Sequence, residues 1–509
     1  MYVITAPHSP GIITELDHTD PPHLNAAIET LSDDVLLEIF DSCLVKNEEI
    51  NPWRDPDVDE SDPYDAWYTL AHVCQRWRYV VFASPRRLNL RLYCSKRRVR
   101  EMLCVWPAFP IVIWDSVNFL LDEDNIIAVL EHPDRVCEIQ LRRLTSLQAE
   151  KLVPFMQKSF PALTKLHLEI DIGLLASDEL MDLLYLPDSF LDGSAPHLRS
   201  LCLSSILFPA LPNFLLSASN LVYLYLYAAR FGYNSPEMVA ALSSLSKLKV
   251  MHIFFLESDD PESEVPAPLP LTRSVLPALS ILALDGDGEY LDDFVGRIDV
   301  PSINYLKVET AYRPIRSHDF FHLSQFIGRV ETFLAFDLAR FHLSPRGMDV
   351  ILSSSRRTHG SRPSALRLKF SCVTDGLLPS LVEACKTSLL PLSNIEKLQI
   401  FTPNSDWDLQ SEFNTVQWLE IIRHFSAVKN LYLRSMCFVP PVAFALKQAM
   451  EEGITGVLPA IQKLTVCGSL PAGPVREAIE QFVTGRGLTV FKTPASSGWQ
   501  IWTRDTHQG

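Results

Sequence analysis

The chain has 509 residues and a formal net charge of −16, from 45 basic and 61 acidic side chains. This length exceeds the size at which a single hydrophobic core stops growing, so we expect two domains or one elongated repeat array. A hydrophobic share of 47% is too high for a disordered chain. The acidic balance argues against a general nucleic-acid binder, because such proteins need cations to displace phosphate counterions.

The sequence contains no pattern typical of a membrane or secretory segment. Its longest apolar stretch, 201–216, is interrupted by Pro209 and Pro212 and is shorter than the ~20 residues needed to span a bilayer. No Lys or Arg precedes Lys46 and no continuous apolar core lies near the start, which is unlike a signal peptide. The ten cysteines form no CxxC pair, a usage typical of reduced thiols in a protein of the cytoplasm or nucleus.

The N-terminal part of the chain begins with an aperiodic stretch and continues with a helix. Residues 1–22 lack hydrophobic periodicity and end in two prolines, so we predict a disordered tail. Ser32 is a suitable N-cap, and apolar residues recur at helical spacing from Leu36 to Leu44. A short amphipathic helix is therefore predicted after Leu31.

An acidic insert separates this helix from the next one. Residues 46–66 contain eight acids between Glu48 and Asp65, and the simplest interpretation is an exposed, solvated loop. A second helical face then runs through Leu70 and Trp77 and ends before Pro85.

These two helical segments resemble an F-box. The matching residues are Leu31–Val35 (LSDDV), the following LLEIF up to Phe40, and Val73–Arg78 (VCQRWR). The continuation from Pro85 to Ile113 resembles that of F-box-like proteins of mushroom-forming fungi. An F-box is the small three-helix domain with which substrate receptors dock onto the Skp-type adaptor of cullin–RING ubiquitin ligases. This chain departs from the family pattern in its Leu-Ser start, where Leu-Pro is usual, and in the acidic insert.

The resemblance implies that residues 28–115 dock on the adaptor through a set of apolar side chains. The assigned docking residues are Leu31, Val35, Leu36, Ile39, Phe40, Leu44, Leu70, Val73, Trp77 and Val80. A helical unit of roughly 60 residues cannot bury so much apolar surface internally, and surplus surface usually has a partner. The alternative is an ordinary helical cap on a repeat array, in which the same side chains are core.

Past residue 130 one pattern recurs, φ-x-x-φ-x-φ with φ an apolar residue. Its alternation predicts a short strand in each copy, and segments between copies, such as 236–245 and 475–483, have helical period. Stacked units of this kind form a leucine-rich-repeat solenoid, with parallel strands on one face and helices on the other. The twelve copies are 23 to 35 residues apart and start at Val136, Leu163, Leu198, Leu221, Leu248, Leu279, Ile303, Val330, Pro363, Ile395, Val428 and Ile461.

The predicted fold class is therefore α/β, with four parts. These are a disordered tail (1–22), a three-helix F-box-like domain (23–115), an irregular leucine-rich-repeat solenoid (116–490) and a C-terminal tail (491–509). A disordered loop is expected at 257–270, where acids and prolines gather.

One face of the solenoid is predicted to bind a protein substrate. Residues between the strand leucines point to this face, and aromatic rings concentrate on it. Rings exposed on a rigid sheet are typical anchors for protein partners. The alternative is that loops between repeats fold over the face and bury them. The predicted substrate-binding residues are Tyr223, Tyr225, Tyr227, Phe254 and Tyr305.

No catalytic residue, metal site or cofactor is predicted. His318 and His322 have i, i+4 spacing, but neither an HExxH motif nor a third ligand accompanies them. The acidic stretch 285–289 lacks the full spacing of a calcium loop and is interpreted as an acidic turn. The basic run from Arg86 to Arg100 is interpreted as a solvated face, although it also suits an acidic partner.

The leading hypothesis is a non-catalytic substrate receptor of the cytoplasm or nucleus. The resemblance implies binding to a Skp-type adaptor, and through it to a cullin–RING ligase, while the solenoid selects an unknown protein substrate; no nucleic acid and no membrane are expected as partners. A second hypothesis is a leucine-rich-repeat scaffold or regulatory protein with no link to ubiquitin. A third is a hydrolase built on the loops.

Overall fold

The computed structural model describes most of the chain and divides it into two compact units. Unit 1 comprises residues 1–93 and 105–110, and unit 2 comprises residues 94–104 and 111–509. The predicted tail 1–22, the acidic insert 46–66 and the loop 257–270 lie outside the described residues. The described ranges are 30–43, 70–71, 73–83, 92–94, 99–105, 108–114, 122–171, 184–207, 213–229, 235–255, 272–310, 320–344, 347–355, 364–371, 377–387, 389–401, 415–434, 439–467, 473–491 and 499–503.

Unit 1 is built around two short helices, α2 (Asp33–Cys43) and α4 (Gln75–Ala83). The rings of Phe40 on α2 and Trp77 on α4 lie 4.8 Å apart between centroids. Arg76 Nη2 bonds Asp33 Oδ1 at 2.8 Å and also donates to the Leu31 carbonyl. One aromatic contact and one charged contact thus join the two helices.

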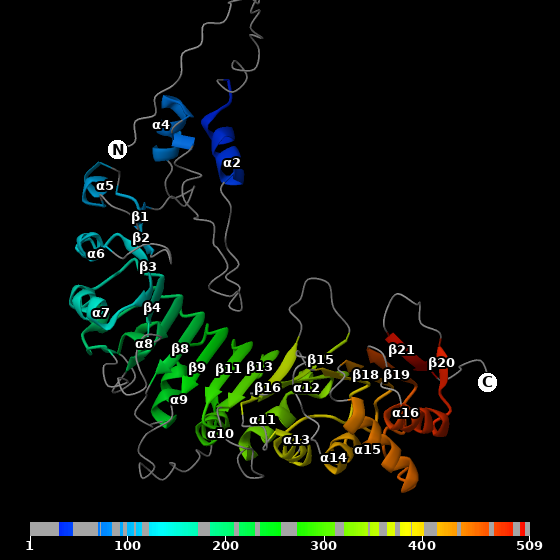
Figure 1. Ribbon diagram of the computed structural model, residues 1–509. Helices are drawn as coiled ribbons and strands as arrows, with labels where there is room; N and C mark the ends of the chain where they lie inside the picture. Colours follow the sequence, from blue (N-terminus) through cyan, green and yellow to red (C-terminus); the bar gives the residue numbers. More distant parts are fainter. Residues whose placement is uncertain are drawn as a thin grey trace, which may run out of the picture. The chain divides into compact units, whose positions relative to one another are not determined.

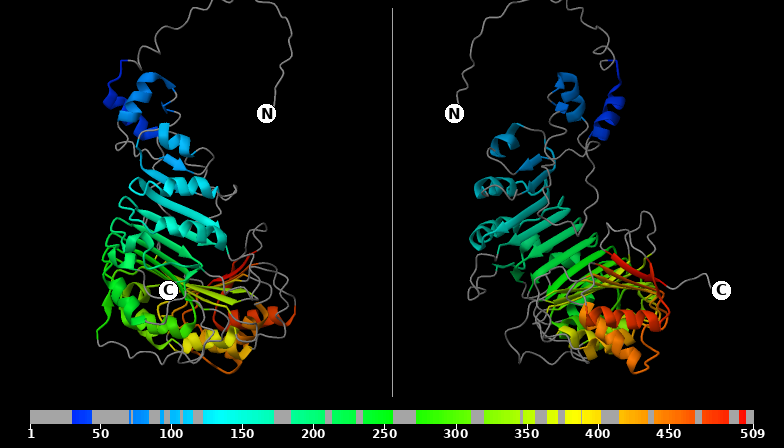
Figure 2. Two further views of the ribbon diagram at one scale, coloured as in Figure 1. Left: turned by 90° about the vertical axis from the view of Figure 1, so that its left-hand side faces the viewer. Right: turned by 45° about the vertical axis from the view of Figure 1, so that its right-hand side comes forward.

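Unit 2 is a repeat array in which parallel strands form one continuous sheet and helices line one of its faces (Figure 1, Figure 2). Hydrogen-bonded pairing gives the order of the strands across the sheet. In that order they are β2 (Ile111–Trp114), β3 (Val136–Leu144), β4 (Lys165–Ile170), β6 (Ser200–Ser204), β8 (Tyr223–Ala229), β9 (Val250–Phe255), β11 (Ile281–Gly286), β13 (Tyr305–Thr310), β16 (Ala365–Phe370), β15 (Gly347–Ser353), β14 (Leu338–Ser344), β17 (Lys397–Phe401), β18 (Asn430–Arg434), β19 (Lys463–Cys467), β21 (Trp499–Thr503) and β20 (Thr489–Phe491).

Helical segments and short accessory strands connect these strands. The α-helices are α5 (Val99–Val105), α6 (Glu123–Leu130), α7 (Ser146–Leu152), α8 (Asn213–Ser217), α9 (Ser235–Ser243), α10 (Gly288–Arg297), α11 (Phe321–Arg329), α12 (Glu331–Leu334), α13 (Leu377–Lys386), α14 (Thr415–Arg423), α15 (Val439–Glu451) and α16 (Pro474–Gly485). The remaining elements are the 3₁₀ turns η1 (Val153–Met156) and η3 (Phe190–Gly193), β1 (Leu92–Cys94), the pair β5 (Leu184–Tyr185) with β7 (Ile206–Leu207), and the pair β10 (Ser274–Val275) with β12 (Ile298–Asp299).

The apolar positions of the repeat pattern form the core between the sheet and the helices. Leu166, Leu201, Leu224 and Leu282, for example, are fully buried in one row across the sheet, with Met251 of β9 between the last two. Capping by local side chains fixes where some of the helices begin: Thr145 and Gln148 form a capping box on α7, and the side chain of Asp122 caps α6. The predicted leucine-rich-repeat architecture is confirmed.

Equivalent turn residues stack into a hydrogen-bonded ladder along the starts of the strands. The backbone N–H of Arg199 donates to the Thr164 carbonyl, Val222 donates to Arg199, and Lys249 donates to Val222. These hydrogen bonds satisfy backbone groups of the turns that would otherwise be left unpaired where the strands begin. It also sets the side chains of these turn residues beside one another.

The array is interrupted by a block of reversed order. β16 pairs in parallel with β13 and β14 pairs in parallel with β17, while β15 lies between β16 and β14 and is antiparallel to both. The predicted strand that starts at Val330 is wrong, because residues 331–334 form α12 and Phe333 is buried. The spacing of Val330 and Phe333 also fits one turn of a helix, so the pattern was ambiguous.

The sheet extends beyond the predicted solenoid boundaries of 116 and 490. β2 pairs in parallel with β3, although its residues were assigned to the F-box-like domain. β21 pairs antiparallel with β19 and β20, although residues 491–509 were predicted to be a tail. At this end of the sheet the antiparallel pairing with β21 covers the edge of β19, which would otherwise expose unpaired backbone groups.

Candidate functional site

The face of the sheet opposite the helices, called the open face below, carries the predicted substrate-binding residues. Tyr227 is 46% exposed, while Tyr223, Tyr225, Phe254 and Tyr305 are half-buried. The rings of Tyr227 and Phe254 stack with centroids 4.7 Å apart, and Tyr225 meets His252 edge-on at 6.2 Å. These residues therefore form one aromatic cluster on β8 and β9.

Tyr305 stands apart from that cluster. The strand register sets it in the same row as Tyr223, with Val250 and Ile281 between them. Three strand spacings separate the two tyrosines, about 14 Å in all. Val250 and Ile281 are themselves buried, so they provide no exposed surface that would join the two rings.

A ladder of alternating charges crosses the open face beside the aromatic cluster. His252 Nε2 lies 2.5 Å from Asp285 Oδ2, and Lys307 Nζ lies 3.2 Å from Asp285 Oδ1 and 2.8 Å from Glu309 Oε2. Lys369 completes the ladder by pairing with Glu309. These groups come from the adjacent strands β9, β11, β13 and β16, so the sheet register holds them in order.

The ladder keeps buried groups charged. Burial alone would raise the pKa of Asp285, but the hydrogen bond and charge of His252 and the charge of Lys307 outweigh it and hold that pKa below its ordinary value. Burial would lower the pKa of Lys307, yet the charges of Asp285 and Glu309 raise it. Burial and these two carboxylates also raise the pKa of the neighbouring Tyr227 hydroxyl.

His252 and Lys307 lie between the strand leucines and so follow the sequence rule for outward-pointing residues, but that rule misses their carboxylate partners. Asp285 and Glu309 each follow the last apolar residue of the φ-x-x-φ-x-φ pattern, one position beyond the end of the motif. Extending the strand alternation by one residue places both on the open face. That extension was the available signal.

Farther along the open face the side chains become basic. The register aligns Arg340, Gln399 and Tyr432 in one row across β14, β17 and β18. Arg340 donates to the side chain of Gln399 at 3.2 Å, and the rings of His342 and Phe401 stack at 5.0 Å. The basic side chains of this part are Arg340, Lys397, Arg434 and Lys463.

In unit 1 the predicted docking residues divide into exposed and buried groups. Val35 and Ile39, one turn apart on α2, are 44% and 39% exposed, and Val73 is 57% exposed. Leu36, Phe40 and Val80 are buried and thus belong to the core of the unit. Leu31, Leu70 and Trp77 are partly buried, and Leu44 lies outside the described residues.

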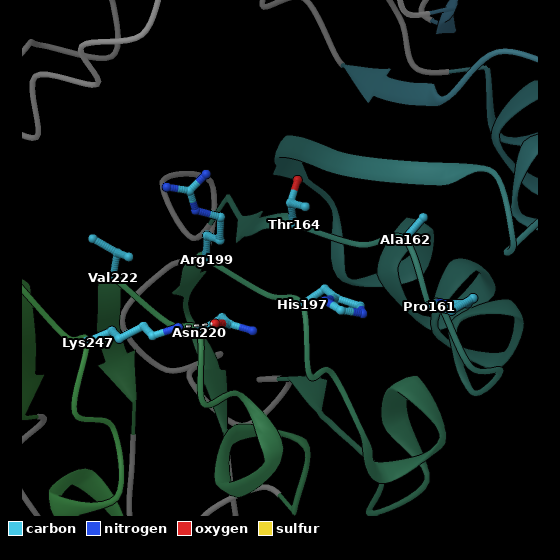
Figure 3. Close-up of a pocket in the computed structure, with 8 residues that line it drawn as sticks. All are labelled: Pro161, Ala162, Thr164, His197, Arg199, Asn220, Val222 and Lys247. Atoms are coloured by element: carbon cyan, nitrogen blue, oxygen red, sulfur yellow. Dashed lines mark hydrogen bonds between the residues drawn. The ribbon is translucent and has the colours of Figure 1, made fainter. Parts of the chain in front are cut away.

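A pocket of about 430 Å³ lies in unit 2 at the starts of β4, β6, β8 and β9 (Figure 3). The turn ladder positions its walls. Asn220 Oδ1 accepts a hydrogen bond from Lys247 Nζ at 2.6 Å, and Asn220 Nδ2 donates to the Pro196 carbonyl at 2.9 Å. The lining residues are Pro161, Ala162, Thr164, His197, Arg199, Asn220, Val222 and Lys247.

The other sequence candidates fall in ordinary structural positions. Asp287 caps α10 and accepts from the Glu289 N–H at 3.1 Å, so the acidic turn leads directly into a helix. His322 lies on α11, while His318 is outside the described residues. Among the described residues there is no group of three or more His, Cys, Asp or Glu side chains arranged to hold a metal. None of the helices that the structure describes has the length and apolar character to cross a membrane.

Comparisons with known proteins yield structural neighbours alone. A scan against protein-family models and a search of curated proteins found no match. Among solved structures, the leucine-rich repeat-containing protein LegL7 from Legionella pneumophila is 12% identical, with a TM-score of 0.26, over 78% of this chain and 97% of that one. Listeria monocytogenes InlP is 16% identical, with a TM-score of 0.19, over 47% of this chain and 67% of that one.

Proposed function

We propose that this chain is a non-catalytic substrate receptor. Unit 1 docks on the Skp-type adaptor of a cullin–RING ubiquitin ligase, and the open face of unit 2 binds a protein substrate. Tethering both on one chain raises the effective concentration of substrate lysines near the recruited ubiquitin-conjugating enzyme.

The observation that carries the binding role is the composition of the open face. Exposed Tyr227 stacks on Phe254, and the row of charges from His252 to Lys369 lies directly beside these rings. Tyrosine is enriched among the residues that dominate binding energy at protein interfaces. Because these charged side chains already pair with one another, they are ordered before a partner binds. Binding at the neighbouring rings therefore costs little additional side-chain entropy.

The adaptor role is supported by the resemblance of unit 1 to an F-box together with its exposed apolar side chains. Val35, Ile39 and Val73 are each more than a third exposed. Exposed branched apolar side chains within so small a unit provide the kind of surface that a protein partner covers.

The second candidate is a leucine-rich-repeat scaffold without a ubiquitin ligase. It is favoured by the burial of Leu36, Phe40 and Val80, which leaves a smaller docking surface than the resemblance implies. In that case the exposed residues of unit 1 have no adaptor to meet, and function depends on the open face alone.

A pull-down of the full chain with purified Skp-type adaptor separates the two candidates. The test variant is Ile39→Asp with Val73→Asp, because both side chains are exposed and the core contact of Phe40 with Trp77 stays intact. The matched control is Tyr79→Asp, on α4 and 70% exposed but outside the predicted docking set. Circular dichroism checks that all variants remain folded.

We expect the wild type and Tyr79→Asp to retain the adaptor and the double variant to lose it. Absence of adaptor binding by the wild-type chain at micromolar concentration, or equal binding by the double variant, would instead favour the scaffold. The substrate arm is read separately, by capturing proteins on the full chain and comparing it with Tyr227→Ala.

A further inference from the structure

We infer that the pocket at the starts of β4, β6, β8 and β9 binds a carboxylate side chain from an acidic, extended segment of a partner protein. The inference deepens the proposed function, since the partner is the protein that the solenoid selects. It places a second contact region at the end of the sheet where the strands begin, separate from the aromatic cluster of the open face.

The charge of the lining is opposite to that of the chain. Three of the eight lining residues, His197, Arg199 and Lys247, carry nitrogen donors on exposed side chains, and none of the eight is acidic. The whole chain has a net charge of −16. A local basic concavity on an acidic protein favours approach of a small anionic group and disfavours a long polyanion such as a nucleic acid.

The hydrogen bonds already made in the pocket decide which anion it fits. The backbone N–H groups of Arg199 and Ser200 donate to the Thr164 carbonyl, and those of Val222 and Tyr223 donate to the Arg199 carbonyl. Phosphate sites commonly rely on free backbone N–H groups at a loop or a helix start. These four N–H groups are already bonded, so side-chain donors are what a ligand meets.

The neutral polar side chains of the lining are similarly engaged. Thr164 Oγ1 donates to the Cys137 carbonyl at 3.0 Å, and Asn220 holds Lys247 while it donates to Pro196. The Arg199 guanidinium keeps a fork of N–H donors whose geometry matches a carboxylate. Lys247, held by Asn220, adds a second positive charge to the lining; Figure 3 shows its side chain reaching Asn220, while the Arg199 side chain is directed away from that contact.

The size and apolar walls of the pocket indicate a polypeptide ligand and not a free ion. A volume of about 430 Å³ far exceeds the volume of one carboxylate group. Pro161, Ala162 and Val222 line the remaining surface and provide contact for the aliphatic part of an acidic side chain and its neighbours. An Asp or Glu within an extended segment satisfies both the charge and the space.

Fluorescence anisotropy with the full chain tests the inference. The probes are a labelled peptide of alternating Glu and Ser, its Gln counterpart, a phosphoserine counterpart and a single-stranded oligonucleotide. The variants are Arg199→Glu and Lys247→Glu. The matched control is Lys249→Glu, an exposed turn residue on the next rung of the same ladder that does not line the pocket.

We expect the Glu peptide to bind and the Gln peptide not to bind. Each pocket variant should weaken the Glu peptide by about tenfold or more, since it removes a charge-assisted contact and adds repulsion. The control Lys249→Glu should change binding by no more than about twofold, as is usual for an exposed charge.

Equal binding of the Glu and Gln peptides, or equal losses in Lys249→Glu and the pocket variants, would overturn the inference. So would binding of the phosphoserine peptide or the oligonucleotide without binding of the Glu peptide. The adaptor pull-down uses the full chain but tests only the docking residues of unit 1. Failure of peptide binding with intact adaptor capture therefore rejects this pocket, and the reverse result rejects the ligase role.

Discussion

Asp285 and Asp292 are both almost fully buried, at 5% and 8% exposure, yet their surroundings differ. Asp285 lies on the open face, where His252 and Lys307 hold its pKa below the ordinary value against the effect of burial. Asp292 lies on α10 in the helix layer. Among the described residues it accepts hydrogen bonds from backbone N–H groups, those of Leu323 at 2.7 Å and His322 at 3.2 Å, and burial raises its pKa.

The difference shows how the two sides of one sheet bury polar groups. On the open face a carboxylate is buried among opposite charges supplied by neighbouring strands, so each repeat depends on the next for neutralisation. In the helix layer the carboxylate of α10 caps the start of α11, so it serves local structure and needs no cation. Asp285 is thus stabilised by charge pairing between strands, and Asp292 by backbone N–H groups at the start of a helix.

The largest expected effect on stability is loss of apolar packing below the charge ladder of the open face. Leu306 is fully buried on the helix-covered face, next to Lys307 on the other side of the same strand. Leu306→Ala should lower the free energy of unfolding by about 4 kcal/mol, because it removes buried apolar atoms and leaves a cavity. Urea denaturation measures the loss, and a change below the effect of Asp285→Ala would contradict the ranking.

Breaking the charge ladder should come next. Asp285→Ala leaves the half-buried ammonium of Lys307 and the half-buried imidazole of His252 without their shared carboxylate, at a cost of about 3 kcal/mol. The same denaturation experiment measures it. A double-mutant cycle with Lys307→Met is the control: if the two losses simply add, the groups are not coupled as described.

Removal of the cap in the helix layer should cost less. Asp292→Ala leaves two backbone N–H groups at the start of α11 unbonded, at a cost of about 2 kcal/mol. Asp292→Asn should restore part of that stability because its amide oxygen still accepts one bond. Equal stability of the Ala and Asn variants would show that the cap contributes little.

The smallest effect is a pair of opposite pH dependences. The depressed pKa of Asp285 gives stability that is present above its ordinary value of 3.8 and is lost as pH falls through the folded value. The raised pKa of Asp292 gives stability present below 3.8 that is lost as pH rises through the folded value. Compared with wild type, Asp285→Asn should therefore destabilise the fold less at acidic pH than at neutral pH. Asp292→Asn should destabilise it more at acidic pH than at neutral pH. Parallel trends for the two variants would refute the contrast.

The fold was largely predictable because its core repeats in the sequence. Apolar residues such as Leu201, Leu224 and Leu282 occupy the same position of their repeats, and residues at that position must be buried to stabilise a stacked array. The reversed block was not predictable, since the spacing that starts at Val330 fits a helix as well as a strand. Strand pairing there depends on contacts between β13 and β16, which are far apart in sequence.

The candidate site was predictable only in part. Side-chain parity along a strand placed Tyr227 and Phe254 on the same face of the sheet, and the structure shows that their rings stack. The partners of His252 and Lys307 lay one residue beyond the motif, and the pocket arises from turns of four different repeats. Which buried side chains of unit 1 are core depends on how α2 meets α4, and periodicity gives no information about that packing.

The reversed block formed by β14, β15 and β16 limits how this array can gain or lose repeats. Between β3 and β9, deleting one strand with its connecting segment brings two parallel neighbours together and preserves the pairing. Within the block only β15 runs against its neighbours, so deleting β14 or β16 alone brings β15 beside β17 or β13 in the opposite direction. Deleting β14 and β15 together, or β15 and β16 together, leaves parallel neighbours on both sides. Any loss of a strand from this block that preserves parallel pairing therefore has to include β15, whereas the repeats from β3 to β9 can be exchanged one at a time.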